Sequence, residues 1–181
     1  NRQVSFAPFL MIDWTSPMMR RSAISGDAID FVSLGDIAPD VVISHMSDPR
    51  MGVHMPLLTG AWGDDDYVRF RAAKDACWQR DGLGHWAILH DGNYAGWGGF
   101  QKEGDEWDFG LVLRPGCFGL GMVITRKALA FARSDPRIPF VTFLLPPSRT
   151  KLGALRRIGA GFVGPVDHDG KAFLKYRLET A

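Results

Sequence analysis

The segment from residue 107 to residue 145 constrains the fold of this chain most tightly. A strand-like run, WDFGLVL (107–113), is followed by RPGCFGLGMV (114–123), which has three glycines within six residues. A helix-like run then extends to about Arg133, and the continuous apolar run FVTFLL (140–145) is typical of a buried strand. If this strand–helix–strand crossover joins neighbours in one sheet, the two strands run parallel.

The residues on either side of the crossover predict antiparallel pairing. HWAILH (85–90), the turn DGN and YAGWGGFQ (94–101) form a hairpin signal, and KEGDE then leads into strand 107–113. After a short helix over TKLGALRRIG, the runs GFVGPV and KAFLKYRLE flank the turn DHDG and predict a second hairpin. The expected fold class is therefore α/β (α+β): a single mixed, mostly antiparallel sheet with one central parallel strand pair and helices on both faces.

The N-terminal part has fewer regular patterns. Residues 1–17 are apolar and aromatic without periodicity, and we expect an arm there, followed by a single domain over 18–181. An exposed arm would favour a homodimer. MMRRSAI (18–24) is interpreted as a short strand, AIDFVSL (28–34) as a helix and DVVISHM (40–46) as a second helical segment after a favourable proline. GDDD (63–66) places carboxylates at the start of a helix over YVRFRAAKDACWQ.

Composition argues against several classes of protein. The net charge is +1 with acids and bases interspersed, which leaves no electrostatic footprint for nucleic acid or an anionic membrane. No apolar run of about 18 residues predicts a membrane span, and the N-terminal residues show no signal-peptide pattern. Cys77 and Cys117 lie far apart with neither disulfide nor metal spacing. We expect a cytoplasmic protein without a metal site.

The glycines at the strand-to-helix junction can form an anion-binding site. Backbone N–H groups in the first turn of a helix lack internal partners, and the helix dipole adds partial positive charge there. Without side chains at Gly116, Gly119 and Gly121, a pyrophosphate could reach these groups. The alternative is that the glycines only permit a tight turn. The spacing matches neither the P-loop nor the dinucleotide-binding fingerprint, since no Gly-Lys-Ser/Thr occurs and GCFGLG reads GxxGxG.

Taken together, residues 85 to 178 resemble the GNAT superfamily of acyl-CoA-dependent N-acetyltransferases. Four features carry the resemblance: strand 107–113 followed by GCFGLG, the helix that follows directly, the strand VTFLLPPS, and LRRIGAGFVG near the end of the last helix. The aspartate before FGLVL is most similar to the branch that acetylates ribosomal-protein N-termini. The resemblance implies that the two parallel strands splay apart to hold coenzyme A.

The sequence departs from the family pattern at several positions. Gly116 stands where the family has Gln or Arg, and Ser148 and Lys151 stand where it has Asn and Ser or Ala. Leu155 occupies the position of a tyrosine that many members use as a general acid, so that role is unassigned here. Positive charge for the phosphates would come from Arg126, Arg149 or Lys151.

The resemblance implies acetyl-CoA as the acyl donor. Its pantetheine arm would pair with the backbone of strand 107–113, and its pyrophosphate would lie on the backbone of the glycine-rich segment. The residues expected to bind it are Leu111, Val112, Leu113, Gly116, Phe118, Gly119, Leu120, Gly121, Met122, Val123, Ser148 and Lys151.

The family chemistry is direct attack of an amine on the thioester, which needs a base. Asp108 is the first candidate because it holds the acidic position of the related branch, and Glu106 is the second. Strand alternation places both carboxylates on one face. The alternative for Glu106 is a solvated turn residue. Ser148 would bind the cofactor or protonate the thiolate through water, or merely cap a helix.

The acceptor is expected near HMSDPRMGVH (45–54). His54, Met55 and Trp97 are the candidate substrate-binding residues, with a half-buried structural histidine and core packing as the alternatives. The leading hypothesis is N-acetylation of a primary amine, either a small molecule or a peptide or protein N-terminus. The alternatives are a non-catalytic acyl-CoA-binding or sensing module, motivated by Gly116 and Leu155, and a plain interaction domain in which the glycines are structural.

Overall fold

The order of helices and strands follows the expected pattern through the second half of the chain. A computed structural model of the protein describes residues 28–51, 55, 60–147, 152–168 and 170–180. Its elements are β1 (Ile29–Val32), α2 (Pro39–Met46), α3 (Asp64–Asp81), β2 (His85–His90), β3 (Asn93–Glu103), β4 (Glu106–Leu113), α4 (Gly121–Ser134), β5 (Phe140–Leu145), α5 (Gly153–Arg157), β6 (Gly161–His168) and β7 (Lys171–Glu179), with 3-10 turns at Leu34–Asp36, Pro49–Met51 and Pro115–Leu120.

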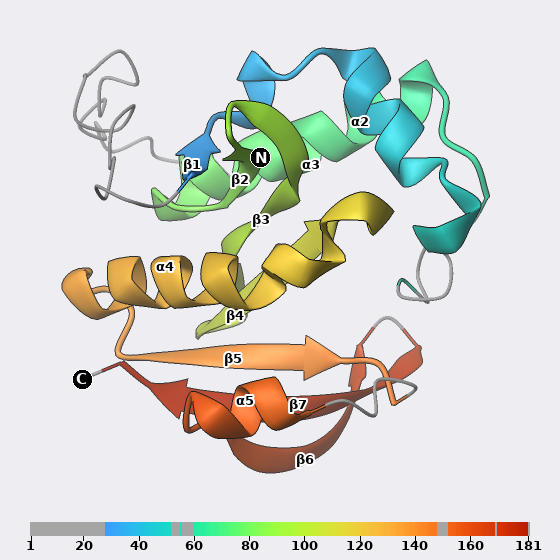
Figure 1. Cartoon of the computed structure of the whole chain (residues 1–181). Coiled ribbons are helices and arrows are strands. Elements are labelled where there is room, and N and C mark those ends of the chain that lie inside the picture. The colour runs from blue at the N-terminus through green and yellow to red at the C-terminus, as the bar shows by residue number, and fades with distance from the viewer. Residues whose placement is uncertain (1–27, 52–54, 56–59, 148–151, 169, 181) are drawn as a thin grey trace, which may run out of the picture.

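The strands form one sheet in the order β1-β2-β3-β4-β5-β7-β6 (Figure 1). Every neighbouring pair is antiparallel except β4 and β5, which are parallel. These two strands are in register at one position only, where Asp108 lies opposite Thr142. Beyond it, Gly110–Leu113 and Leu144–Leu145 have no ladder partner across the pair; we call this region the β4–β5 gap. The mixed sheet with a splayed central parallel pair is confirmed.

Residue alternation along β4 assigns the two faces of the sheet. Trp107 and Phe109 belong to the main core cluster, which also contains Ala128 and Leu129 of α4. Val112, of opposite parity, packs with Val42 and Met46 of α2 and with Phe70 of α3. Helices therefore cover both faces, and Asp108 projects from the face that carries α2 and α3.

Glycines let β3 approach β4 very closely. A Cβ atom built on Gly96 would lie 2.2 Å from the carbonyl oxygen of Val112, and one built on Gly98 would lie 2.5 Å from that of Gly110. No side chain fits at such distances from backbone atoms. The run YAGWGGF is thus required by the packing of β3 against the strand that carries Asp108.

The helix expected over residues 28–34 is wrong. Ile29–Val32 form β1, which pairs antiparallel with β2 from Ile29 opposite His90 to Val32 opposite Ala87. Ile29 is buried and Asp30 is exposed, the alternation of a strand. Pairing with β2 outweighs the local helix signal there. The expected strand at 18–24 and the arm at 1–17 lie outside the described residues, and no helix of the described part is long and apolar enough to cross a membrane.

Candidate active site

The β4–β5 gap leaves one edge of β4 open. Leu111, Val112 and Leu113 pair through their other edge with Gly98, Trp97 and Gly96 of β3. On the side of β5 their backbone groups have no partner strand. An extended ligand with amide groups could add to this edge, because β-strand addition needs only unpaired backbone N–H and C=O groups.

Asp108 lies at the closed end of the gap. Its side chain is half-buried, and its Oδ1 atom accepts a hydrogen bond from Thr142 Oγ1 at 3.2 Å. Burial raises the pKa of Asp108 to about 7, although the bond from Thr142 opposes the increase. A carboxyl group whose pKa lies near the working pH is suited to accept a proton from a substrate and release it again.

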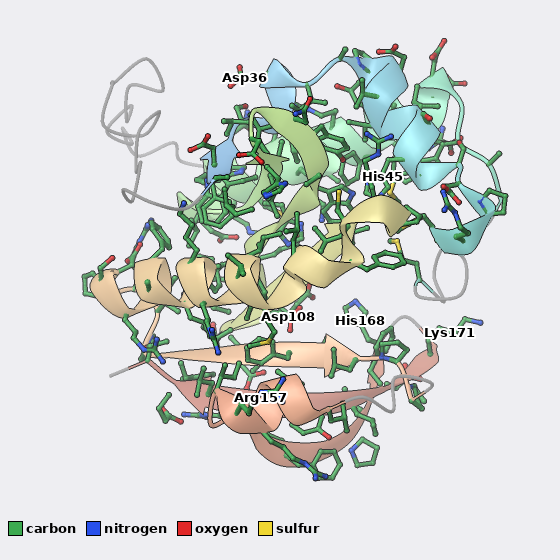
Figure 2. All side chains as sticks on the ribbon, viewed as in Figure 1. Asp36, His45, Asp108, Arg157, His168 and Lys171 are labelled. Atoms are coloured by element: carbon green, nitrogen blue, oxygen red, sulfur yellow. The ribbon has the colours of Figure 1, made fainter. Side chains whose placement is uncertain are left out.

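Charged groups from two other strands influence the same carboxyl. Glu103 of β3 raises the pKa of Asp108, whereas His168 of β6 lowers it. Figure 2 labels Asp108 beside β5 and His168 near the arrowhead of that strand. The ring of His168 also packs edge-on against Phe173, with ring centroids 6.0 Å apart. Groups from three other strands, β3, β5 and β6, thus influence the Asp108 carboxyl.

The raised pKa of Asp108 predicts that its ionised form destabilises the fold. Because the folded state holds the proton more tightly than the unfolded state, protonated Asp108 stabilises the fold. This stabilisation is lost as pH rises from about 4 through about 7. Asp108→Asn should therefore be more stable than wild type at pH 8, by on the order of a few kcal/mol, with little difference at pH 4. Urea unfolding at both pH values measures this, and equal differences at the two would contradict it.

Glu106 lies on the same face of β4 but has a different environment. Its carboxylate forms an ion pair with Lys175 of β7. The two side chains are 35% and 19% exposed, so the pair is partly shielded from water. The ammonium of Lys175 occupies the Glu106 carboxylate and so competes with a substrate ammonium for it, which leaves Asp108 as the first candidate.

The glycine-rich segment forms an exposed turn ahead of α4. Pro115–Leu120 is a 3-10 turn, and α4 starts at Gly121 with no side chain capping its first amides. Side chains built on Gly116 or Gly119 would meet nothing within 4 Å. Phe118 and Val123 are 44% and 40% exposed. Residues 116–123, here called the cradle, therefore form an open turn after the end of β4, in which the amides of Cys117 and Gly121 already donate to the carbonyls of Arg114 and Phe118.

The candidate substrate residues are not brought together at a surface. Trp97 is buried, and its indole N–H donates to the Met46 sulfur at 3.4 Å. Met55 packs, partly buried, against the same cluster. His54 and the candidate cofactor residues Ser148 and Lys151 lie outside the described residues.

A buried polar pair supports the end of β4 from the side of α2. His45 Nδ1 lies 3.1 Å from the Tyr94 hydroxyl. Burial lowers the pKa of His45 to about 4, so its ring is neutral at pH 7. A half-buried structural histidine was one alternative for residues 45–54, and His45, labelled in Figure 2, is buried.

Sequence reasoning missed two groups beside Asp108. Thr142 is the one polar residue in FVTFLL, and a hydroxyl in a strand expected to be buried was a signal that it has a specific partner. His168 is in the turn DHDG, where no local pattern links it to a residue 60 positions earlier. Among the described residues, no cluster of His, Cys, Asp or Glu side chains is arranged to hold a metal ion.

Comparison with known proteins was informative only at the level of structure. No protein-family model and no curated protein sequence matches the chain. An acetyltransferase from Agrobacterium tumefaciens superposes with a TM-score of 0.66 at 21% identity, covering 83% of this chain and 90% of that chain. A GNAT-family acetyltransferase from Bacillus anthracis has a TM-score of 0.63 at 16% identity, with 84% and 93% covered.

A spermidine N-acetyltransferase from Vibrio cholerae, in complex with CoA and spermine, has a TM-score of 0.65 at 8% identity, with 84% and 94% covered. At these identities the similarity is one of fold. The superposition extends over 83% to 84% of this chain and 90% to 94% of the other chains. This chain has the fold of the GNAT acetyltransferases.

Proposed function

We propose that the protein transfers an acetyl group from acetyl-CoA to a primary amine. The observation that carries this proposal is the position of Asp108, whose pKa is about 7, at the closed end of the β4–β5 gap and on the same strand that leads into the cradle. The gap and the cradle together suit an extended amide-containing ligand that ends in phosphates. Solved structures of this fold include one with CoA bound.

The reaction follows from these groups. Asp108 takes a proton from the acceptor ammonium, and the neutral amine attacks the thioester carbonyl carbon. A backbone N–H on the open edge near Val112 or Leu113 stabilises the oxyanion. The carbon–sulfur bond then breaks, the second amine proton passes to the departing thiolate directly or through water, and coenzyme A leaves as a thiol while the acetyl group stays on the nitrogen as an amide. The residues that bind the cofactor in this proposal are Leu111, Val112, Leu113, Gly116, Phe118, Gly119, Leu120, Gly121, Met122, Val123, Ser148 and Lys151.

The acceptor is a primary amine of small size or the N-terminus of a peptide. The spermidine acetyltransferase with spermine bound supports a small amine, and the similarity to the ribosomal-protein branch supports an N-terminus. In either case the amine reaches Asp108 from the face of α2 and α3, because Asp108 projects there. We place the reaction in a reducing cytoplasm and without a metal, in keeping with two distant cysteines.

A second candidate is an acyl-CoA-binding or sensing module without turnover. Leu155, at the position of the family's tyrosine acid, is partly buried against the main core and has no proton to donate. Gly116 likewise offers no side chain to the phosphates. Turnover of a panel of amines separates the two candidates, since both bind acetyl-CoA.

Acetyl-CoA should raise the unfolding temperature of the protein. A ligand at about 100 times its dissociation constant stabilises the folded state by about 2.7 kcal/mol, which is several degrees for a domain of this size. Thermal unfolding with acetyl-CoA, and with NAD and ATP as controls, measures the shift. An increase with acetyl-CoA alone supports the proposed function; no increase, or an equal increase with all three, would leave the cradle as a structural turn.

A further inference from the structure

We propose that Thr142 is a positioning residue, whose hydroxyl holds the Asp108 carboxylate at the closed end of the β4–β5 gap and stabilises its ionised form. This inference rests on the proposed function for its catalytic meaning, because Asp108 is the base there. Thr142 itself touches neither the cofactor nor the amine. It acts through the proton affinity of Asp108.

The contact is fixed by the backbone. Thr142 is the residue of β5 that lies opposite Asp108 in the parallel pair, at the position where the two strands are in register. Thr142 is 2% exposed, so its side chain cannot rotate its hydroxyl into solvent. The threonine is therefore held at the one point from which a β5 side chain can reach the carboxyl.

The hydroxyl has two acceptors and one hydrogen. Thr142 Oγ1 lies 3.2 Å from Asp108 Oδ1 and 3.3 Å from the carbonyl oxygen of Trp107. When Asp108 is ionised, the hydroxyl donates to the carboxylate. When Asp108 holds the proton, its own O–H can donate to Oγ1 while the threonine hydrogen turns to Trp107. The buried hydroxyl therefore keeps a partner in both protonation states, as a base that cycles between them requires.

The pKa of Asp108 also depends on burial and on three groups other than Thr142. Burial is the largest influence and raises the pKa of Asp108, and the charge of Glu103 raises it further. Thr142, the charge of His168 and the backbone N–H of Leu144 lower it, with Thr142 the strongest of the three. Without the hydroxyl, the carboxyl would be protonated over more of the neutral pH range, and less of the enzyme would carry a free base.

The test replaces the hydroxyl without changing the size of the side chain. Thr142→Val removes it, and Thr142→Ser keeps it. Thr180→Val is the matched control, because Thr180 is also buried and donates its hydroxyl to a backbone carbonyl, that of Ile138, away from Asp108. The Asp108 carboxyl resonance, assigned by its absence in Asp108→Asn, is titrated by carbon-13 NMR in each variant. Thr142→Ala is a second variant without a hydroxyl should the valine variant fold poorly.

The expected result is an upward shift of the Asp108 titration by about one pKa unit in Thr142→Val. The serine variant and Thr180→Val should titrate as wild type does. In an acetylation assay, kcat/KM of Thr142→Val should be about tenfold lower at pH 6 and close to wild type at pH 9. A merely structural threonine would lower the rate equally at both pH values.

The NMR titration also separates this inference from the proposed function. An unshifted carboxyl in both hydroxyl-free variants, or an equal shift in Thr180→Val, would overturn the role of Thr142. A shift confined to the two hydroxyl-free variants, Thr142→Val and Thr142→Ala, supports it. If that shift is observed and no amine is acetylated by wild type, the proposed function fails while the control of the Asp108 carboxyl by Thr142 stands.

Discussion

Replacing Asp108 by asparagine should reduce kcat/KM for the amine by about 10²- to 10⁴-fold, the usual contribution of a positioned general base. Asparagine has nearly the same shape and still accepts the bond from Thr142, but it cannot take a proton. The affinity for acetyl-CoA should remain close to wild type, because the cradle and the open edge of β4 are unchanged. Steady-state kinetics and calorimetric binding of acetyl-CoA measure the two quantities.

Glu106→Gln is the matched control on the same face of the same strand. Glu106 is paired with Lys175, so its loss should change turnover far less than the loss of Asp108. If Glu106→Gln were the inactive variant and Asp108→Asn the active one, the base would have to be reassigned to Glu106. If both variants lost acetyl-CoA binding, the changes would be structural and neither residue would be identified as the base.

Gly98→Ala should destabilise the fold by about 3 kcal/mol, as overpacking against atoms that cannot move does. The added methyl group would lie 2.5 Å from the carbonyl oxygen of Gly110 and 3.0 Å from the Cα atom of Leu111. Either β3 withdraws from β4 or β4 shifts toward β5. A shift of β4 would also displace Asp108, two residues from Gly110, so activity should fall along with stability.

The control for this change is Gly161→Ala on edge strand β6. A Cβ atom there would lie 3.9 Å from the carbonyl oxygen of Arg177, an ordinary van der Waals distance. Both variants place a methyl group on a strand glycine near a carbonyl of the neighbouring strand, so their difference isolates the close approach. Urea unfolding measures both, and a Gly98→Ala variant as stable as Gly161→Ala would show that β3 and β4 can separate at little cost.

The second half of the fold was predictable from the sequence because its signals are local. The turns DGN, KEGDE and DHDG lie between runs that alternate or are wholly apolar, and FVTFLL coincides with β5 from its first residue to its last. The glycines of GCFGLG mark the end of β4 and the start of α4. Each of these patterns is contained within a few residues, so no knowledge of the rest of the chain was needed.

The N-terminal part shows where such reasoning fails. Residues 28–34 follow plausible caps, yet Ile29–Val32 form a strand because their backbone groups find partners in β2, almost 60 residues later. For Trp97, core packing was the alternative to substrate binding, and its ring is buried in a cluster with residues of α2 and α3. Such contacts depend on which faces meet, and no local pattern encodes that.

The candidate site also has features that the sequence predicts and features that depend on the tertiary structure. The sequence by itself determined the residue types, the strand that carries Asp108 and the glycine-rich turn that follows it, because these depend on neighbours along the chain. Only the tertiary structure decided that Thr142, 34 positions away, lies opposite Asp108, and that burial moves the pKa of this carboxyl to about 7. Register across a parallel pair and the exclusion of water are properties of assembled strands, and an isolated segment has neither.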